Sequence, residues 1–179
     1  MKNRIDELIK KYQFWEVVSI QPSQIQIKKE IRKLCEKNDC GQYGKNYMCP
    51  PAVGSLEDYE KRVNTYKKGL LLSQVFKIES RMDYRRMKEV LEEFGQNMKE
   101  FHLEIKQSGI DGDVYSAGHC TLCKKCAILS EQPCRFPEFA MPSLEAAGID
   151  VVKLSSDSGL MYNNGADSFT MIGLLLYND

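Results

Sequence analysis

The sequence lacks an excess of charge of either sign, and it lacks any long apolar run. Lysine plus arginine number 25 and aspartate plus glutamate number 25, so the formal net charge of the 179-residue chain is zero. A protein that binds nucleic acid electrostatically needs a basic face, and a membrane-spanning helix needs about 20 mostly apolar residues in succession. We therefore expect neither a nucleic-acid partner nor insertion into a membrane.

Several signals that would assign a compartment or an activity are also missing. The opening segment, MKNRIDELIKKYQ, is amphipathic and contains acidic residues. It has neither the apolar core nor the small-residue cleavage site of a secretory signal. The chain also has no phosphate-binding loop and no hydrolytic G-x-S-x-G motif. We expect a cytoplasmic protein whose function must be inferred from other residues.

Cysteine, in contrast, is abundant. The chain contains seven cysteines. In a reducing compartment such thiols serve metal binding or catalysis more often than disulfide formation. An odd number of cysteines also fits poorly with a framework made only of disulfides. The cysteines are therefore predicted to bind metal, and their spacing divides them into two sets.

The first set lies in the segment SAGHCTLCKKCAILSEQPCRFP and consists of Cys120, Cys123, Cys126 and Cys134. Repeated C-x2-C steps with a further cysteine nearby are typical of iron–sulfur ligands. A structural zinc ion usually takes two C-x2-C pairs from separate places in the chain, and three ligands between Cys120 and Cys126 would crowd one tetrahedral ion. The spacing favours a 4Fe–4S cluster, with zinc as the alternative.

The second set lies in LCEKNDCGQYGKNYMCPP and consists of Cys35, Cys40 and Cys49. Gly41 and Gly44 allow the backbone to approach a bulky group closely. The Cys49–Pro50 pair is similar to the remote Cys-Pro ligand of two-cluster ferredoxins.

Two assignments of these ligands remain open. In one, the second set holds a second cluster whose fourth iron has no cysteine and is open to a substrate. In the other, Cys49 or Cys134 supplies the distant fourth ligand of the opposite set, as in two-cluster ferredoxins. The irregular spacing of the second set also permits a zinc ion, or one cluster with spare thiols.

The pattern of apolar residues predicts one domain over residues 1–179, of class α/β or α+β, with helices packed on a mixed sheet of about five strands. Runs of β-branched, aromatic or other apolar residues predict strands at 14–20, 70–78, 114–117, 149–154 and 169–177. Steps of three and four residues, with capping signals, predict helices at 3–12, 28–37, 55–69, 83–107 and 142–147. Strands 70–78 and 169–177 are the most apolar and are expected at the centre. Cys-rich loops at 35–54 and 116–137 should carry the function, because loops commonly do.

Four segments, GQYGKNYMCPP, AGHCTLCKKCA, QPCRFP and PSLEAAGIDV, resemble a family of prokaryotic proteins known as predicted metal-binding proteins, a domain of unknown function. The resemblance runs from about Cys35 to the last strand. It implies that the cysteines bind metal, and it implies no particular activity. Members of the family are similar to single-domain cytoplasmic proteins of anaerobes.

Together these features predict an iron–sulfur protein of redox metabolism with one or two 4Fe–4S clusters, one of which has an open iron for a small substrate. The partner would be a redox protein or a small-molecule substrate. Two alternatives are an electron carrier with fully ligated clusters and a binding module stabilised by zinc. Whether the protein is an enzyme depends on the open iron.

Overall fold

A four-stranded sheet forms the centre of the protein. The computed structural model describes residues 2–80 and 82–178. Within this part of the chain the strands are β1 (Glu16–Ile20), β2 (Lys68–Lys77), β3 (Gly112–Tyr115) and β4 (Ser168–Tyr177). They lie in the order β1-β2-β4-β3, and every neighbouring pair is antiparallel. The α/β class is confirmed, but the expected count of five strands and the expected mixed sheet are wrong.

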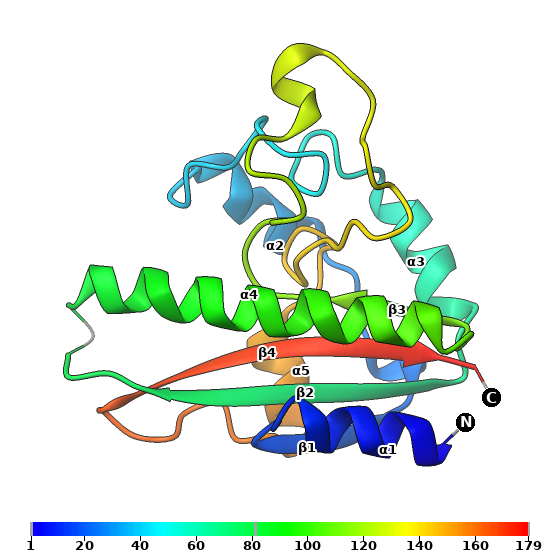
Figure 1. Cartoon of the computed structure of the whole chain (residues 1–179), viewed down its shortest axis with the longest axis vertical. Coiled ribbons are helices and arrows are strands. Elements are labelled where there is room, and N and C mark those ends of the chain that lie inside the picture. Colours follow the sequence, from blue (N-terminus) through cyan, green and yellow to red (C-terminus); the bar gives the residue numbers. More distant parts are fainter. Residues whose placement is uncertain (1, 81, 179) are drawn as a thin grey trace.

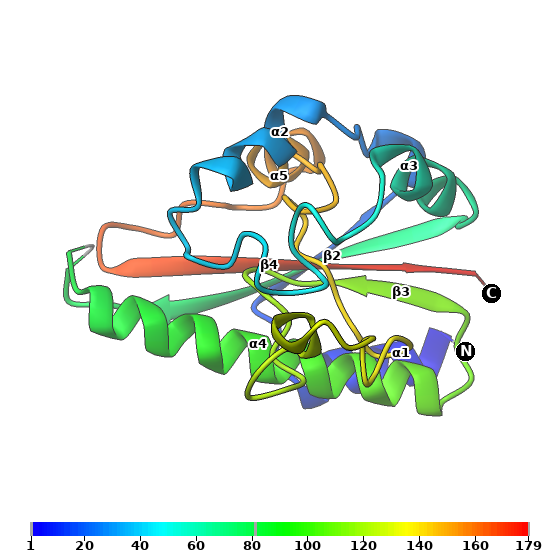
Figure 2. The same ribbon diagram turned by 90° about the horizontal axis from the view of Figure 1, so that it is seen from above.

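Helices cover both faces of this sheet. They are α1 (Lys2–Lys11), α2 (Lys29–Leu34), α3 (Leu56–Asn64), α4 (Tyr84–Gln107) and α5 (Val151–Ser158), with short 3-10 helices η1 (Pro22–Gln24), η2 (Cys35–Lys37) and η3 (Ala127–Ser130). Figure 1 shows the long helix α4 crossing the sheet. Seen from above, α1 and α4 lie on one face, whereas α2, α3 and α5 lie on the other (Figure 2). No helix among the described residues combines the length and the apolar character that crossing a bilayer requires.

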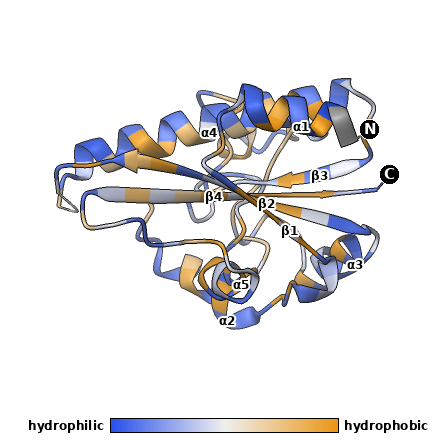
Figure 3. Ribbon diagram, turned by 90° about the horizontal axis from the view of Figure 1, so that it is seen from below, coloured by the Kyte–Doolittle hydropathy of each residue, from blue (hydrophilic) through white to orange (hydrophobic). Residues whose placement is uncertain are grey.

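The two central strands are the two most apolar ones, as predicted. β2 and β4 pair along their whole length, from Lys68 opposite Tyr177 to Lys77 opposite Ser168. Leu71 and Leu72 of β2 are fully buried although they point to opposite faces. A strand covered by helices on both sides needs such a continuous apolar run rather than alternation. The hydrophobic colouring of both strands is visible in Figure 3.

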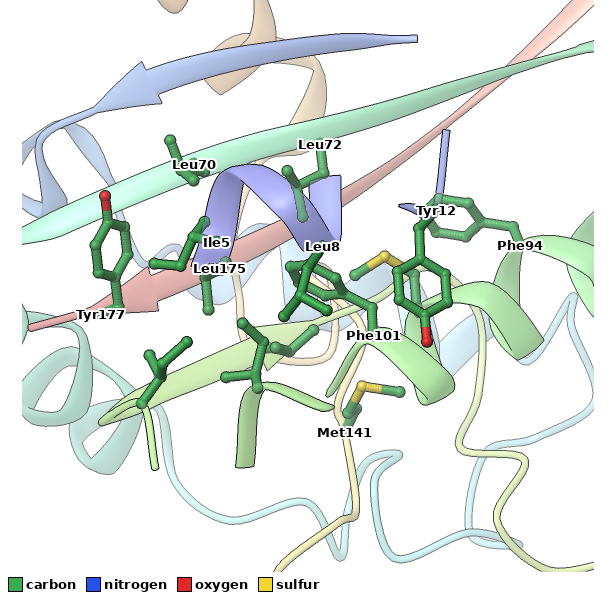
Figure 4. Close-up of a cluster of buried hydrophobic side chains, with 14 of the residues drawn as sticks. Ile5, Leu8, Tyr12, Leu70, Leu72, Phe94, Phe101, Met141, Leu175 and Tyr177 are labelled. Carbon is green, nitrogen blue, oxygen red and sulfur yellow. The ribbon is translucent and has the colours of Figure 1, made fainter. Parts of the chain in front are cut away.

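The core between the sheet and α4 depends on the apolar stripe of that helix. Phe94 and Phe101 are completely buried, and the Phe101 ring meets the rings of Tyr12 and Phe14 edge-on at centroid distances of 5.9 and 5.4 Å. Leu8 of α1 packs into the same cluster (Figure 4). Residues at three- and four-residue steps along α4 thus face the sheet, as the sequence predicts.

The predicted strand at 149–154 is a helix. Asp150 stands before α5 with an extended backbone, and its side chain accepts a hydrogen bond from the Lys153 backbone N–H. This N-cap satisfies a free donor of the first turn and outweighs the strand preference of Val151 and Val152. Of the predicted strand, only Ile149 pairs as a strand residue does, in a single antiparallel bridge to Ile27.

Two predicted helices also differ from the structure. The predicted helix at 142–147 is absent: Ser143 makes a single parallel bridge to Ser116, and residues 144–148 form a turn. Helix α3 begins after the expected N-cap Ser55 but ends at Asn64 instead of reaching Gly69. Gly69 lies inside β2, where an added Cβ would come within 2.8 Å of the Ile20 side chain. This glycine therefore serves close packing in the sheet and is not a helix terminator.

Both cysteine-bearing segments lie together beyond the β3 edge of the sheet. Figure 1 shows the cyan segment before α3 and the yellow-green segment after β3 side by side there, and Figure 2 agrees. Segments separated by about eighty residues of sequence are thus neighbours, as a shared site requires, and the sheet and α4 provide the platform beneath them.

Candidate metal centre

The cysteines of the first set surround one cavity. Cys120, Cys123, Cys126 and Cys134 all line it, with Tyr47 and Met48 from the other segment and Leu122 and Phe136 from their own. The four thiols are half-buried. The chain reverses direction through η3, whose N-cap is Cys126, and this turn returns Cys134 to the same cavity. Sequence spacing and tertiary structure thus agree on a common location for these side chains.

Two backbone amides partly offset the effect of burial on the Cys120 thiol. Burial raises the pKa of the Cys120 thiol, but hydrogen bonds from the backbone N–H groups of Leu122 and Met141 act in the opposite direction. Hydrogen bonds to the charged form of a group favour that form. Thiolate is the form that binds metal, so these two amides favour ligation at Cys120.

The segment of the second set is fastened to the first by Asn46 and Tyr47. Asn46 is 5% exposed; its Nδ2 donates to the carbonyl oxygen of Cys120 at 2.9 Å, and its Oδ1 accepts from the Met48 backbone N–H at 2.9 Å. The Tyr47 hydroxyl donates to the Gln132 carbonyl oxygen at 2.8 Å. Sequence reasoning missed Asn46, because nothing in the chain around an asparagine indicates a partner 74 residues away.

The second set lies directly beside the first. Cys35 is half-buried at the start of η2, Cys40 is exposed and Cys49 is buried. Electrostatic effects on the Cys49 thiol come from Cys40 and Cys35 and also from Cys120 and Cys126. Cys49 is therefore at the junction of the two sets. Its position is compatible with either assignment of the ligands.

The crowding of thiols around Cys49 disfavours ionisation there. Burial, followed by the neighbouring cysteines, raises the pKa of the Cys49 thiol to about 12. Burial also raises the pKa of the Cys35 thiol, with further contributions from Glu145 and Cys40, while Arg32 acts in the opposite direction. Thiolates at such close range would repel one another, and a bound metal would offset that repulsion.

The donor chemistry of this region suits a thiophilic metal. Even so, among the described residues no group of three or more His, Cys, Asp or Glu side chains is arranged as a ready-made site for one metal ion. The thiol-lined cavity is small, about 20 Å³. The four thiols thus share a cavity without converging on a single point, and a cofactor larger than one ion would have to widen the space between the two segments.

Two further side chains near Cys35 were missed from the sequence. Arg32 donates from Nε to the Ala146 carbonyl oxygen at 2.7 Å and from Nη1 to the Gly54 carbonyl oxygen at 2.6 Å, whereas its buried Nη2 has no partner among the described residues. Burial raises the pKa of Glu145, which is within electrostatic range of Cys35. Neither residue belongs to a sequence motif, and single charged side chains are too common in sequences to be diagnostic.

The polar residues next to the first set do not line its cavity. His119 is exposed. Arg135 donates from Nη1 to the Lys125 carbonyl oxygen at 3.0 Å, so it braces the segment between Cys123 and Cys134. We assign neither residue a ligand role.

Comparisons with known proteins give one match. No curated protein and no solved structure matches the chain. The sequence model of the family described as "Predicted metal-binding protein (DUF2284)" matches residues 18–177. This range contains all seven cysteines and most of the sheet. The chain therefore belongs to this family of predicted metal-binding proteins, a domain of unknown function.

Proposed function

We propose that the protein is an iron–sulfur protein of redox metabolism whose first centre is a 4Fe–4S cluster held by Cys120, Cys123, Cys126 and Cys134. The observation that carries the proposal is the shared cavity of these four thiols. It is supported by their C-x2-C-x2-C-x7-C spacing, which is typical of cluster ligands. Cluster ligation also explains why the thiols surround a space without converging on a point.

The second set decides whether the protein is a catalyst or an electron carrier. Cys35, Cys40 and Cys49 provide three thiolates, so a cluster held by them alone would have one iron open to a small substrate. The exposure of Cys40 would give such a substrate access. If Cys35, Cys40 and Cys49 are instead spare thiols, the one remaining cluster is fully ligated and the protein is a carrier that docks on a redox partner.

The main alternative is a zinc-stabilised binding module. The small volume of the thiol-lined cavity favours it, because a single ion needs less room than a cube of iron and sulfide. Zinc binding contributes directly to folding free energy, so chelation would then unfold the protein.

The proposal is tested by purification without oxygen, followed by assays of iron and acid-labile sulfide and by electron paramagnetic resonance (EPR) of the reduced protein. We expect iron and sulfide in equal amounts and a cluster signal. Addition of cyanide or a small thiol should change the signal if one iron is open and leave it unchanged in a carrier. Stoichiometric zinc without sulfide would contradict the cluster.

A further inference from the structure

A second, much larger cavity lies at the β3 edge of the sheet, next to the thiol-lined one. Its volume is about 580 Å³, within the range of about 300–1,000 Å³ usual for small-molecule sites. Helix α3 contributes Arg62 to it, α4 contributes His102 and Lys106, and β3 lies between them. Met48 and Ala140 line both cavities, so the two share a wall.

Two residues that line this cavity each carry a buried polar atom that has no hydrogen-bond partner among the described residues: Nδ1 of His102 and the hydroxyl of Tyr115. His102 is 4% exposed and Tyr115 is 1% exposed. Burying a polar group without a partner destabilises a protein. Two such residues around one cavity point to a polar ligand bound there.

His102 can only accept a hydrogen bond from such a ligand. Its Nε2 lies 3.4 Å from the Glu138 carbonyl oxygen, and because a carbonyl cannot donate, Nε2 carries the proton. Burial lowers the pKa of His102 to about 4, so the ring is neutral near pH 7 and Nδ1 presents a lone pair. The ligand must therefore bring an N–H or O–H group.

The other polar groups of the cavity are mainly donors. Burial raises the pKa of Tyr115, so its hydroxyl stays protonated. Lys106 uses one ammonium proton on the Gly112 carbonyl oxygen, at 3.0 Å, and keeps two. Arg62 binds the Asp113 carboxylate through Nε and Nη2, and this ion pair does not involve its Nη1. Because Asp113 offsets the charge of Arg62, Lys106 is the cation left for an anionic group.

The apolar part of the wall comes mainly from Met48, Val53, Phe139 and Pro142, and Gln107 adds an exposed amide. Glu138 also lines the cavity but is exposed, so water screens its charge.

We propose that this cavity binds an organic acid that has an apolar body and a hydroxyl or amino group next to its carboxylate. Lys106 and Tyr115 hold the carboxylate, and Nδ1 of His102 accepts the proton of the adjacent group. This role goes beyond metal binding and requires no metal. The shared wall would place the ligand next to the cysteines.

The test measures binding of three matched probes to the full-length protein by calorimetry: 3-phenyllactate, 3-phenylpropionate and 3-phenyllactamide. The first carries both groups, the second lacks the hydroxyl and the third lacks the charge. We expect 3-phenyllactate to bind at least about ten-fold more tightly than either of the others, because 3-phenylpropionate leaves Nδ1 of His102 unpaired and 3-phenyllactamide leaves Lys106 without an anionic partner.

Three variants separate a direct contact from a structural effect. Tyr115→Phe removes only the hydroxyl, His102→Gln keeps an amide N–H for Glu138 but loses the acceptor, and Lys106→Met removes the charge. Each should weaken 3-phenyllactate binding about ten-fold or more, whereas Lys88→Met, on an exposed part of α4, should not.

Tyr115→Phe gives a second readout, because removing an unpaired buried hydroxyl should raise the melting temperature of the ligand-free protein. The proposal is overturned if 3-phenyllactate and 3-phenylpropionate bind equally, or if none of the three probes binds because water alone fills the cavity. It is also overturned if a folded Tyr115→Phe protein keeps full affinity.

Discussion

At the scale of single residues, the seven cysteines carry the functional proposal. Their spacing can be read from the sequence, because a loop with a thiol every third residue has few other uses. What the sequence could not give is their mutual arrangement. Three features depend on contacts between distant parts of the chain: the position of Cys49 between the two sets, the bridging amide of Asn46 and the hydrogen bonds of the Arg32 guanidinium.

Replacement of Cys123 by serine should remove the first centre, since a serine oxygen is a poor ligand for a soft metal. We expect iron and sulfide per chain to fall by half if two clusters are present, and nearly to zero if there is one. Lys124→Gln, at an exposed position of the same loop, is the control and should keep the wild-type content. Unchanged iron in Cys123→Ser would show that this thiol is not a ligand.

His102 should make the protein less stable in acid. Its pKa is lowered from 6.5 to about 4, first by burial and also by Lys106 and Arg62. Because the folded-state pKa lies below the unfolded value, the stability linked to the neutral ring is complete above pH 6.5 and is lost as the pH falls toward 4. The loss is about 3 kcal/mol at 1.4 kcal/mol per pKa unit.

Urea unfolding of the wild type and His102→Gln at pH 7 and pH 4.5 measures this effect. The variant should lose less unfolding free energy between the two pH values, since all other titrating groups are the same. Equal losses in both proteins would show that His102 does not titrate in this range.

At the scale of elements, apolar periodicity predicted what tertiary packing later uses. The apolar stripe of α4 and the continuous apolar runs of β2 and β4 are long. Each therefore specifies which side chains face the core. The predicted strand at 149–154 was wrong because the segment is short, so its apolar pattern does not decide between strand and helix. In so short a segment, one capping side chain such as Asp150 outweighs strand preference.

Phe101→Ala should destabilise the protein by about 3–5 kcal/mol, the usual cost of deleting a buried aromatic ring. Phe101 is completely buried between Tyr12 and Phe14. Leu91→Ala, on the exposed side of α4 at 40% exposure, should change the unfolding free energy by less than about 0.5 kcal/mol. Similar losses in the two variants, measured by chemical denaturation, would mean that α4 does not pack through the Phe101 face.

The contact between the two cysteine-bearing segments should depend on the hydrogen bonds of Asn46. Asn46→Ala leaves the Met48 N–H and the Cys120 carbonyl without their partner, which costs about 1–3 kcal/mol. Asn46→Asp keeps the acceptor for Met48 but loses the donor and adds a negative charge beside the thiolates. We expect both variants to release metal to a chelator faster than the wild type, and Asn46→Asp to be the faster of the two.

Thermal unfolding and the rate of metal release check this prediction. Lys45→Ala, an exposed neighbour, serves as the control. Release at the wild-type rate from both Asn46 variants would show that the segments are held together in some other way.

At the scale of the whole molecule, the protein is a covered antiparallel sheet with its chemistry gathered beyond one edge. The β3 edge carries the thiol-lined cavity and the larger polar cavity side by side. The class of fold and the two cysteine-rich segments could be predicted from the sequence. The antiparallel order of the strands and the adjacency of the cavities could not, because both follow from the path of the whole chain.

The most direct test of the iron–sulfur proposal is a crystal structure of protein purified and crystallised without oxygen, with anomalous diffraction recorded at the iron and zinc absorption edges. We predict an iron signal with the shape of a 4Fe–4S cube bonded to Cys120, Cys123, Cys126 and Cys134. The same map shows whether Cys35, Cys40 and Cys49 hold a second cluster with an open iron. A single zinc ion bonded to these cysteines, with no iron signal, would contradict the proposal.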